Sequence, residues 1–152
     1  KTASLFCTAA ESGATLSDAP ENYVQALRDY GANLGMAFQI VDDLLDFEAN
    51  EKVIGKPVGR DLLHGVMTLP AILLIQHYPH DTSIKAVFED RENPEKLKKA
   101  VEMIRNSSVL QEVSQVAESY SNKAREALKA LPDLSARRAL LDLTDYVVHR
   151  NQ

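Results

Sequence analysis

The residues from Gly31 to Asp46 constrain the fold of this chain more than any other stretch. They contain no proline, no charge before Asp42, and apolar residues at positions that suit a helix rather than a strand. On a helical wheel of about 100° per residue, one narrow sector holds Gly31, Gly35, Gln39, Asp42 and Asp46, with Asp43 at its edge. The rest of the circumference is apolar, which predicts a buried helix.

Three carboxylates on one side of a buried helix need a cation. Like charges three or four residues apart on a helix repel each other, and an unpaired ion in apolar surroundings is costly. Mg²⁺ is usually held by one or two carboxylates together with water and substrate phosphates. We therefore expect Asp42, Asp43 and Asp46 to form a Mg²⁺ site that faces a cavity.

The alternative is a solvated acidic helix end. Gly31 and Gly35 count against it, because a glycine inside a helix costs about 1 kcal/mol. Two of them are easier to explain where something passes close to the helix backbone.

The composition limits the possible partners and the setting. The chain has 152 residues, enough for one domain, and its 17 basic and 22 acidic residues leave no positive surplus for nucleic acid. No apolar run is long enough for a transmembrane segment. Cys7 is the only cysteine, which excludes an internal disulfide and favours a cytoplasmic setting. The chain opens on Lys1 without an initiator methionine, so we expect a segment of a longer protein.

The remaining sequence predicts helices separated by proline and glycine. No stretch alternates with a period of two, so the predicted class is all-α. We expect residues 1–152 to form part of a single domain. Helical patterns cover about residues 1–14 (ending near Gly13), 20–47, 68–78, 82–89, 94–104, 108–131 and 135–149.

Residues 48–67 form the only glycine-rich stretch and the only long connection. Lys52, Lys56 and Arg60 lie on it, directly after the acidic helix. Cationic side chains on such a loop suit a phosphate-bearing ligand whose oxygens bridge a metal to lysine and arginine. An ordinary surface loop with solvated charges is the alternative.

These motifs together resemble the trans-prenyl diphosphate synthases, the all-helical family that makes geranylgeranyl and longer polyprenyl diphosphates. Phe38-Gln39 with Asp42, Asp43 and Asp46 looks like the family's second aspartate-rich motif. Lys1-Thr2 is similar to a Lys-Thr pair on a helix that lines the active site. The other matching elements are Gly55-Lys56-Pro57, Gly59-Arg60-Asp61 and Thr68-Leu69-Pro70.

The resemblance implies a fold and a reaction. The fold is an antiparallel helical bundle of the isoprenoid synthase type, present here as its C-terminal half. The reaction is the Mg²⁺-dependent transfer of an allylic prenyl group to isopentenyl diphosphate, a 1′-4 chain elongation in isoprenoid biosynthesis. The family's enzymes work as dimers, so a partner chain of the same or of an unlike sequence is expected.

The resemblance also implies roles for single residues. Asp42, Asp43 and Asp46 are the expected Mg²⁺ ligands. Lys1 and Lys56 are expected to neutralise diphosphate oxygens, and Thr2 and Gln39 to make polar contacts near the reacting end. Phe38 and Arg60 complete the expected substrate-binding set. The two glycines are expected to leave room beside the growing prenyl chain.

Two departures from the family pattern keep other readings open. The first aspartate-rich motif lies upstream in the family and is absent, so this segment alone is expected to be inactive. Val66 stands where most members have a lysine. A noncatalytic regulatory subunit of a heteromeric synthase is therefore the alternative. A helical protein that holds a different metal is a third possibility, but this sequence lacks the Glu-x-x-His pairs that di-iron bundles use. A terpene cyclase is disfavoured because the Phe-Gln and Gly-Lys-Pro elements are typical of chain elongation.

Overall fold

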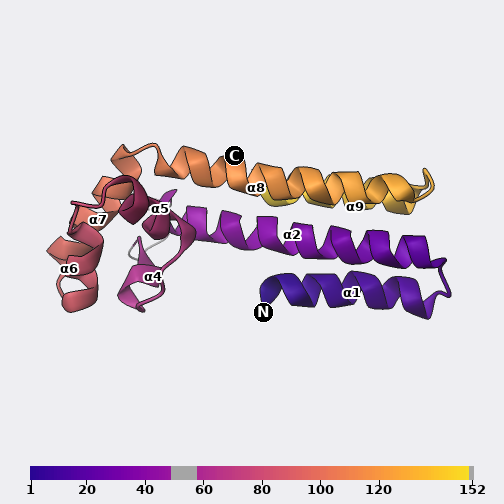
Figure 1. The fold of residues 1–152 in the computed structure, drawn as a ribbon, viewed down its shortest axis with the longest axis horizontal. Coiled ribbons are helices and arrows are strands. Elements are labelled where there is room, and N and C mark those ends of the chain that lie inside the picture. Colours follow the sequence, from indigo (N-terminus) through magenta and orange to yellow (C-terminus); the bar gives the residue numbers. More distant parts are fainter. Residues whose placement is uncertain (49–57, 151–152) are drawn as a thin grey trace. The chain divides into compact units, whose positions relative to one another are not determined.

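The computed structural model of the chain describes residues 1–48 and 58–150. All regular structure in these two ranges is helical (Figure 1), which confirms the predicted all-α class. The elements are α1 (Thr2–Leu16), α2 (Glu21–Glu48), α4 (Arg60–Leu63), α5 (Leu69–His77), α6 (Ser83–Glu89), α7 (Pro94–Asn106), α8 (Val109–Ala127), the 3₁₀ turn η1 (Leu128–Ala130) and α9 (Ser135–His149). Among them is no helix with both the length and the apolar character that crossing a membrane requires.

Most helix boundaries agree with the sequence prediction, and α1 is one of the exceptions. It continues through Gly13 to Leu16, whereas the prediction ended it near Gly13. A single glycine costs only about 1 kcal/mol in a helix, and Ala14 beside it is buried. Burial of the following turn therefore outweighs the glycine, and the helix ends three residues later.

Local caps explain where the shorter helices begin. The Asn93 side chain accepts a hydrogen bond from the Glu95 backbone N–H at 3.1 Å, which fixes the start of α7. At the start of α8 the Ser107 hydroxyl accepts from the Val109 N–H at 3.2 Å. The sequence prediction begins this helix at about residue 108, and the structure begins it at Val109. The prediction also extends this helix through residue 131, but α8 ends at Ala127 and η1 follows.

The described chain divides into two compact units. Unit 1 is Lys1–Val41 with Gln115–Gln152, and unit 2 is Asp42–Ser114. The expectation that residues 1–152 belong to a single domain of a longer protein stays a prediction.

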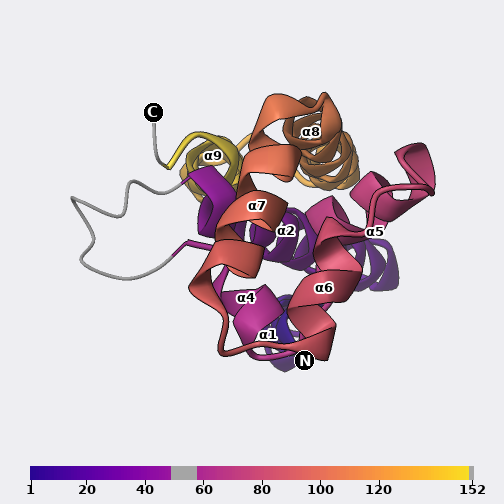
Figure 2. The same ribbon diagram turned by 90° about the vertical axis from the view of Figure 1, so that its left-hand side faces the viewer.

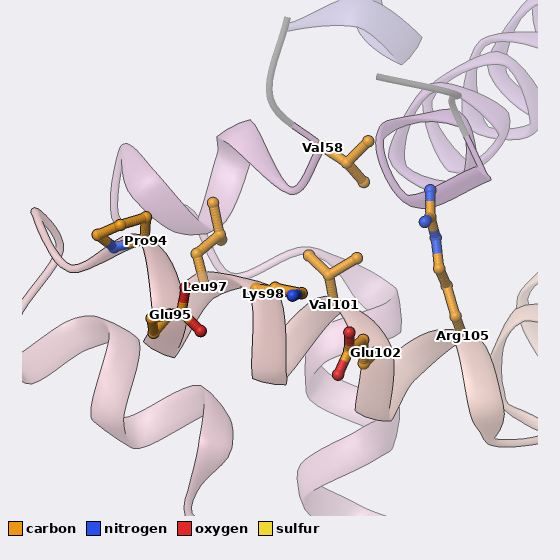
Figure 3. A pocket seen from close by; sticks show the side chains of 8 residues that line it. All are labelled: Val58, Pro94, Glu95, Leu97, Lys98, Val101, Glu102 and Arg105. Carbon is orange, nitrogen blue, oxygen red and sulfur yellow. The ribbon is translucent and has the colours of Figure 1, made fainter. Parts of the chain in front are cut away.

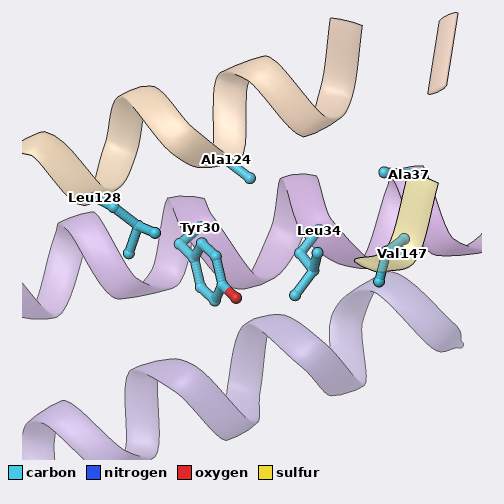
Figure 4. Close-up of a cluster of buried hydrophobic side chains, with 6 residues drawn as sticks. All are labelled: Tyr30, Leu34, Ala37, Ala124, Leu128 and Val147. Carbon is cyan, nitrogen blue, oxygen red and sulfur yellow. The ribbon is translucent and has the colours of Figure 1, made fainter. Parts of the chain in front are cut away.

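Unit 1 is built from long helices that lie alongside one another, with α1 and α2 running in opposite directions (Figure 1). Its buried cluster joins three helices and η1, and Figure 4 shows its members: Tyr30, Leu34, Ala37, Ala124, Leu128 and Val147. The Tyr30 hydroxyl donates a hydrogen bond to the Leu140 carbonyl oxygen at 3.0 Å. The one polar atom that α2 brings into this cluster is thus satisfied by α9.

The two glycines of α2 permit a close contact with α1. A Cβ added to Gly31 would lie 2.5 Å from the Phe6 carbonyl oxygen, and one added to Gly35 would lie 2.6 Å from the Ala3 Cα. Both contacts are with backbone atoms, so no side chain can move aside. The expectation that something passes close to these glycines is confirmed. The expectation that they leave room for a prenyl chain is wrong, because α1 fills that space.

Unit 2 is built from short helices around the end of α2. In it α6 packs against both α4 and α7 (Figure 2). Phe47 and Leu62 are fully buried here, as is Ile104 on α7. Gly59, directly before α4, has φ +74°, and a Cβ on it would lie 2.8 Å from Val101 Cγ2. Only glycine fits this position without strain.

Candidate functional site

The three predicted ligands lie near the C-terminal end of α2 in different surroundings. Asp42 is exposed, Asp43 and Asp46 are partly buried, and the Asp46 side chain is 12% exposed. The C-terminal end of a helix carries a partial negative charge. The three aspartates and Glu48 lie in its last turns and therefore add to an already negative field, and this strengthens the need for nearby cations.

Asp46 is held by the turn that leads into α4. Its Oδ1 accepts a hydrogen bond from the Arg60 backbone N–H at 3.2 Å, and its Oδ2 accepts one from the Asp61 N–H at 3.1 Å. Its backbone carbonyl accepts from the Gly59 N–H at 3.0 Å. The Arg60 Nε lies 3.9 Å from the same Oδ1. The sequence predicted no role of this kind for Asp46.

The next residue of α2 is bound by a second cation. The Arg105 Nε donates to the Phe47 carbonyl oxygen at 2.7 Å. The last four carbonyls of a helix have no partner within it, and here two successive ones are bonded by Gly59 and by Arg105. A guanidinium at this point also opposes the negative end of the helix dipole.

Asp61, which lies on α4, adds a further carboxyl group beside the aspartates of α2. Burial raises the pKa of this carboxyl above its ordinary value, and the charges of Asp46 and Asp42 raise it further. The positive charges of Arg60 and His64 oppose part of that rise. Asp61 thus lies where the carboxylates at this end of α2 concentrate negative charge.

The donor chemistry fits a hard divalent cation. In residues 1–48 and 58–150, no three histidine, cysteine, aspartate or glutamate side chains gather closely enough to hold a metal. Asp42 and Asp43 nevertheless offer two carboxylates with access to solvent. One or two carboxylates completed by water and substrate phosphates is the usual way in which proteins hold Mg²⁺. The metal-ligand assignment stays a prediction.

Thr2 and Gln39 were each predicted to make polar contacts near the reacting end, and the structure brings the two side chains together. The Thr2 hydroxyl donates to the Gln39 Oε1 at 2.9 Å, across 37 residues of sequence. Lys1 is the exposed residue that precedes α1. The contact joins two of the motifs on which the sequence interpretation depends.

Phe38 is surrounded by protein groups. Its ring centroid lies 5.5 Å from that of Phe6, and the Arg150 guanidinium carbon lies 4.3 Å from the ring centroid. Both contacts belong to unit 1 and give the ring a packing role. Its predicted contact with substrate remains untested by this geometry.

The remaining predicted residues come from the connection after α2. Lys56 lies outside the described residues. Arg60 begins α4, and half of its side chain is exposed. Val66, at the position where a cation was expected, is also half exposed.

Sequence reasoning missed Asp61 and Arg105. Asp61 belongs to the Gly59-Arg60-Asp61 element of the family resemblance, and its short distance in sequence from Asp42, Asp43 and Asp46 is the signal that could have found it. Arg105 lies 58 residues from its partner Phe47 and carries no local signal.

A separate hollow of about 390 Å³ lies along α7 in unit 2. Figure 3 shows Pro94 at one end of it, with Val58 and Arg105 at the other. Its charged lining residues carry both signs: Glu95, Lys98, Glu102 and Arg105. Among the described residues, none that the sequence predicts to bind substrate or metal lines it.

Comparison with known proteins identifies the family. The polyprenyl synthetase family profile matches residues 1–104. A prenyl transferase of Synechocystis is 37% identical over 150 residues, which are 99% of this chain and 46% of that protein. Heptaprenyl diphosphate synthase component 2 of Bacillus subtilis is 35% identical over 150 residues, which are 99% of this chain and 43% of that protein.

A solved structure agrees with both the sequence match and the fold. The crystal structure of a polyprenyl synthase from Caulobacter crescentus, complexed with calcium and isoprenyl diphosphate, is 36% identical and superimposes with a TM-score of 0.87. The match covers 100% of this chain and 47% of that one. The chain thus spans about half the length of the relatives it matches. On this evidence the chain belongs to the polyprenyl synthetase family.

Proposed function

We propose that the protein carrying this chain is a Mg²⁺-dependent polyprenyl diphosphate synthase. It joins an allylic prenyl diphosphate to isopentenyl diphosphate and lengthens the prenyl chain by one five-carbon unit. Membership of the family and the relative crystallised with calcium and isoprenyl diphosphate support this assignment. The geometric observation that carries it is the Thr2–Gln39 hydrogen bond, because it links two separate motifs expected at the reacting end.

The acidic end of α2 is the proposed metal-binding element. Asp42, the exposed aspartate of the three, holds the ion together with its neighbour Asp43. When bound, Mg²⁺ neutralises negative charge on the diphosphate that leaves the allylic carbon. Arg60, Lys56 and Lys1 provide further positive charge for diphosphate oxygens.

The polar pair of unit 1 has a positioning role in this proposal. Because the Thr2 hydroxyl donates to the Gln39 Oε1, the Gln39 amide has a defined orientation. A fixed amide can orient a substrate without losing rotamer freedom at the moment of binding.

The proposal extends to the assembly and the setting. The segment alone is inactive, because the first aspartate-rich motif of the family lies outside it. The full-length protein works as a dimer of like or unlike chains, in the cytoplasm, and residues 1–152 are the second half of its single helical domain.

The alternative is a noncatalytic subunit of a heteromeric synthase. Two observations favour it: one relative is named a component 2, and Val66 is half exposed where a cation was expected. A full-length protein that transfers prenyl groups only after a second chain is added would support this alternative.

The first experiment measures incorporation of radiolabelled isopentenyl diphosphate by the full-length protein with an allylic diphosphate and Mg²⁺. We expect Asp42→Asn to lower turnover on the order of 100-fold or more. Circular dichroism should show unchanged helix content. Asp29→Asn is the matched control, an exposed aspartate on the same helix whose carboxylate accepts from the Gln25 amide, and its turnover should stay within about twofold of the wild type. Equal turnover in Asp42→Asn and the wild type would remove the metal-ligand assignment.

A further inference from the structure

The three aspartates of α2 do not share one environment. Asp42 is exposed, whereas Asp43 and Asp46 are both partly buried, and the Asp46 side chain is only 12% exposed. Mg²⁺ dehydrates reluctantly and usually keeps several waters in proteins. A carboxylate with little access to solvent is therefore a poor direct ligand for it.

The oxygens of Asp46 are already engaged. Each accepts one backbone N–H, from Arg60 at 3.2 Å and from Asp61 at 3.1 Å, and the Asp46 carbonyl accepts from Gly59. A single residue thus bonds three successive backbone amides. Hydrogen bonds from N–H groups to a carboxylate are about twice as strong as bonds between neutral groups.

The turn from Gly59 to Asp61 needs such support. Gly59 has a left-handed backbone conformation, and the helix that follows has only four residues. The first N–H groups of a helix have no partner inside it. Asp61 also brings a second negative charge close to Asp46, so without these hydrogen bonds the contact would be repulsive.

From this geometry we infer that Asp46 is a positioning residue and not a metal ligand. Its carboxylate fixes the Gly59–Asp61 turn, and through it the backbone that carries Arg60, whose Nε lies 3.9 Å from the same carboxylate. Asp42 and Asp43 bind the metal, while Asp46 places the cation that meets the diphosphate. This assignment of Asp46 rests on the proposed function, and it gives Asp46 a different role from Asp42 and Asp43.

The first test needs no substitution. Amide hydrogen exchange of residues 58–63 is measured in the full-length protein with and without Mg²⁺. A positioning role predicts protection of the Arg60 and Asp61 amides in both conditions. Protection that appears only after Mg²⁺ is added would overturn the inference, because the turn would then depend on the metal.

The second test compares Asp46→Asn with Asp42→Asn. Asparagine keeps one acceptor oxygen and replaces the other with a donor, so one of the two backbone bonds is lost. We expect amide exchange at Arg60 and Asp61 to quicken by about tenfold in Asp46→Asn. It should stay unchanged in Asp42→Asn.

Metal binding separates the two roles independently of catalysis. Mn²⁺ is titrated in the presence of inorganic pyrophosphate, and free Mn²⁺ is followed by electron paramagnetic resonance. Asp42→Asn should weaken Mn²⁺ binding by about tenfold or more, whereas Asp46→Asn should change it by less than about threefold. Equal losses in the two variants would make Asp46 a ligand and overturn the inference.

Steady-state kinetics supplies the functional readout. Asp46→Asn should raise KM for the allylic diphosphate by about tenfold and alter kcat by less than about threefold, because the cation and not the metal is displaced. If the full-length protein transfers no prenyl group, the proposed function fails, and the exchange and Mn²⁺ measurements still decide the role of Asp46.

Discussion

The two parts of α2 are fixed in position by different physical means. Residues 21–41 belong to unit 1 and pack by shape, since Gly31 and Gly35 lie directly against the backbone of α1. Residues 42–48 belong to unit 2 and are held by charge and hydrogen bonds, from the Gly59–Asp61 turn and from Arg105. Van der Waals packing is insensitive to pH and salt, whereas electrostatic contacts respond to both.

This difference suits the chemistry assigned to each part. At Gly31 and Gly35 the packed part has no room for an added Cβ, because the neighbouring atoms belong to the backbone of α1. The charged part tolerates changes in volume better than the loss of a partner, since each removed donor leaves a carboxylate or carbonyl unsatisfied. An element that must receive a metal and a diphosphate can be held by charge and hydrogen bonds in this way. Residues 21–41, which are held by close packing, are not suited to that task.

The largest expected effect is at the packed part. Gly31→Ala should destabilise the full-length protein by about 3 kcal/mol, because the new methyl group meets the Phe6 carbonyl oxygen at 2.5 Å. Urea denaturation measures the change. Gly13→Ala is the matched control: nothing lies within 4 Å of its added Cβ, and it should stabilise the protein by up to about 1 kcal/mol. Wild-type stability in Gly31→Ala would mean that α1 and α2 are not in close contact.

A smaller effect is expected at the charged part. Arg105→Met keeps much of the side-chain stem and removes every donor, so the Phe47 carbonyl loses its 2.7 Å hydrogen bond. We expect a loss of about 1.5 kcal/mol in the free energy of unfolding. Arg105→Lys keeps the positive charge near the helix end and tests the contribution of that charge alone. If lysine restores full stability, the dipole interaction and not the Nε hydrogen bond holds this end of α2.

The smallest effect is a contrast in pH dependence. The raised pKa of Asp61 means that the folded state keeps a proton that the unfolded state has lost, so its stabilising contribution disappears as pH rises through the acid range above the ordinary aspartate value. Asp61→Asn should flatten the stability curve there. Burial raises the pKa of Tyr30 in the same sense, so its contribution disappears only above the ordinary tyrosine value near pH 10, and Tyr30→Phe should flatten that limb.

Thermal unfolding of both variants between pH 4 and pH 11 checks this contrast. Each variant serves as the control for the other, since Asp61→Asn should leave the alkaline limb unchanged and Tyr30→Phe should leave the acid limb unchanged. Identical pH profiles for the two variants and the wild type would show that neither group titrates differently after folding.

Much of the fold could be predicted because its signals are local. Pro70, Asn93 and Pro94 mark helix starts in the sequence, and the apolar circumference of α2 predicts a buried helix by its own periodicity. The partners of that helix could not be predicted in this way. Nothing in the sequence says that α1 occupies the face with Gly31 and Gly35, so the glycines were assigned to a substrate.

The site divides along the same line. Asp42, Asp43 and Asp46 lie within five residues of sequence, and so the cluster of carboxylates on one side of the helix could be predicted. The engagement of Asp46 depends on a left-handed turn at Gly59 and on amides 14 and 15 residues away. The Thr2–Gln39 contact spans 37 residues and was not predicted, because the family resemblance implied only that each side chain makes polar contacts near the reacting end.

Because α2 is one continuous helix, its repeat sets the direction in which its carboxylates point relative to its glycines. Gly35 and Asp42 are seven residues apart, and two helical turns at about 3.6 residues each bring them to nearly the same direction. Inserting one residue between them would rotate the carboxylates by about 100° away from the line of the glycines. An insertion of seven residues would restore that phase but shift the acid cluster by about 10 Å along the helix axis.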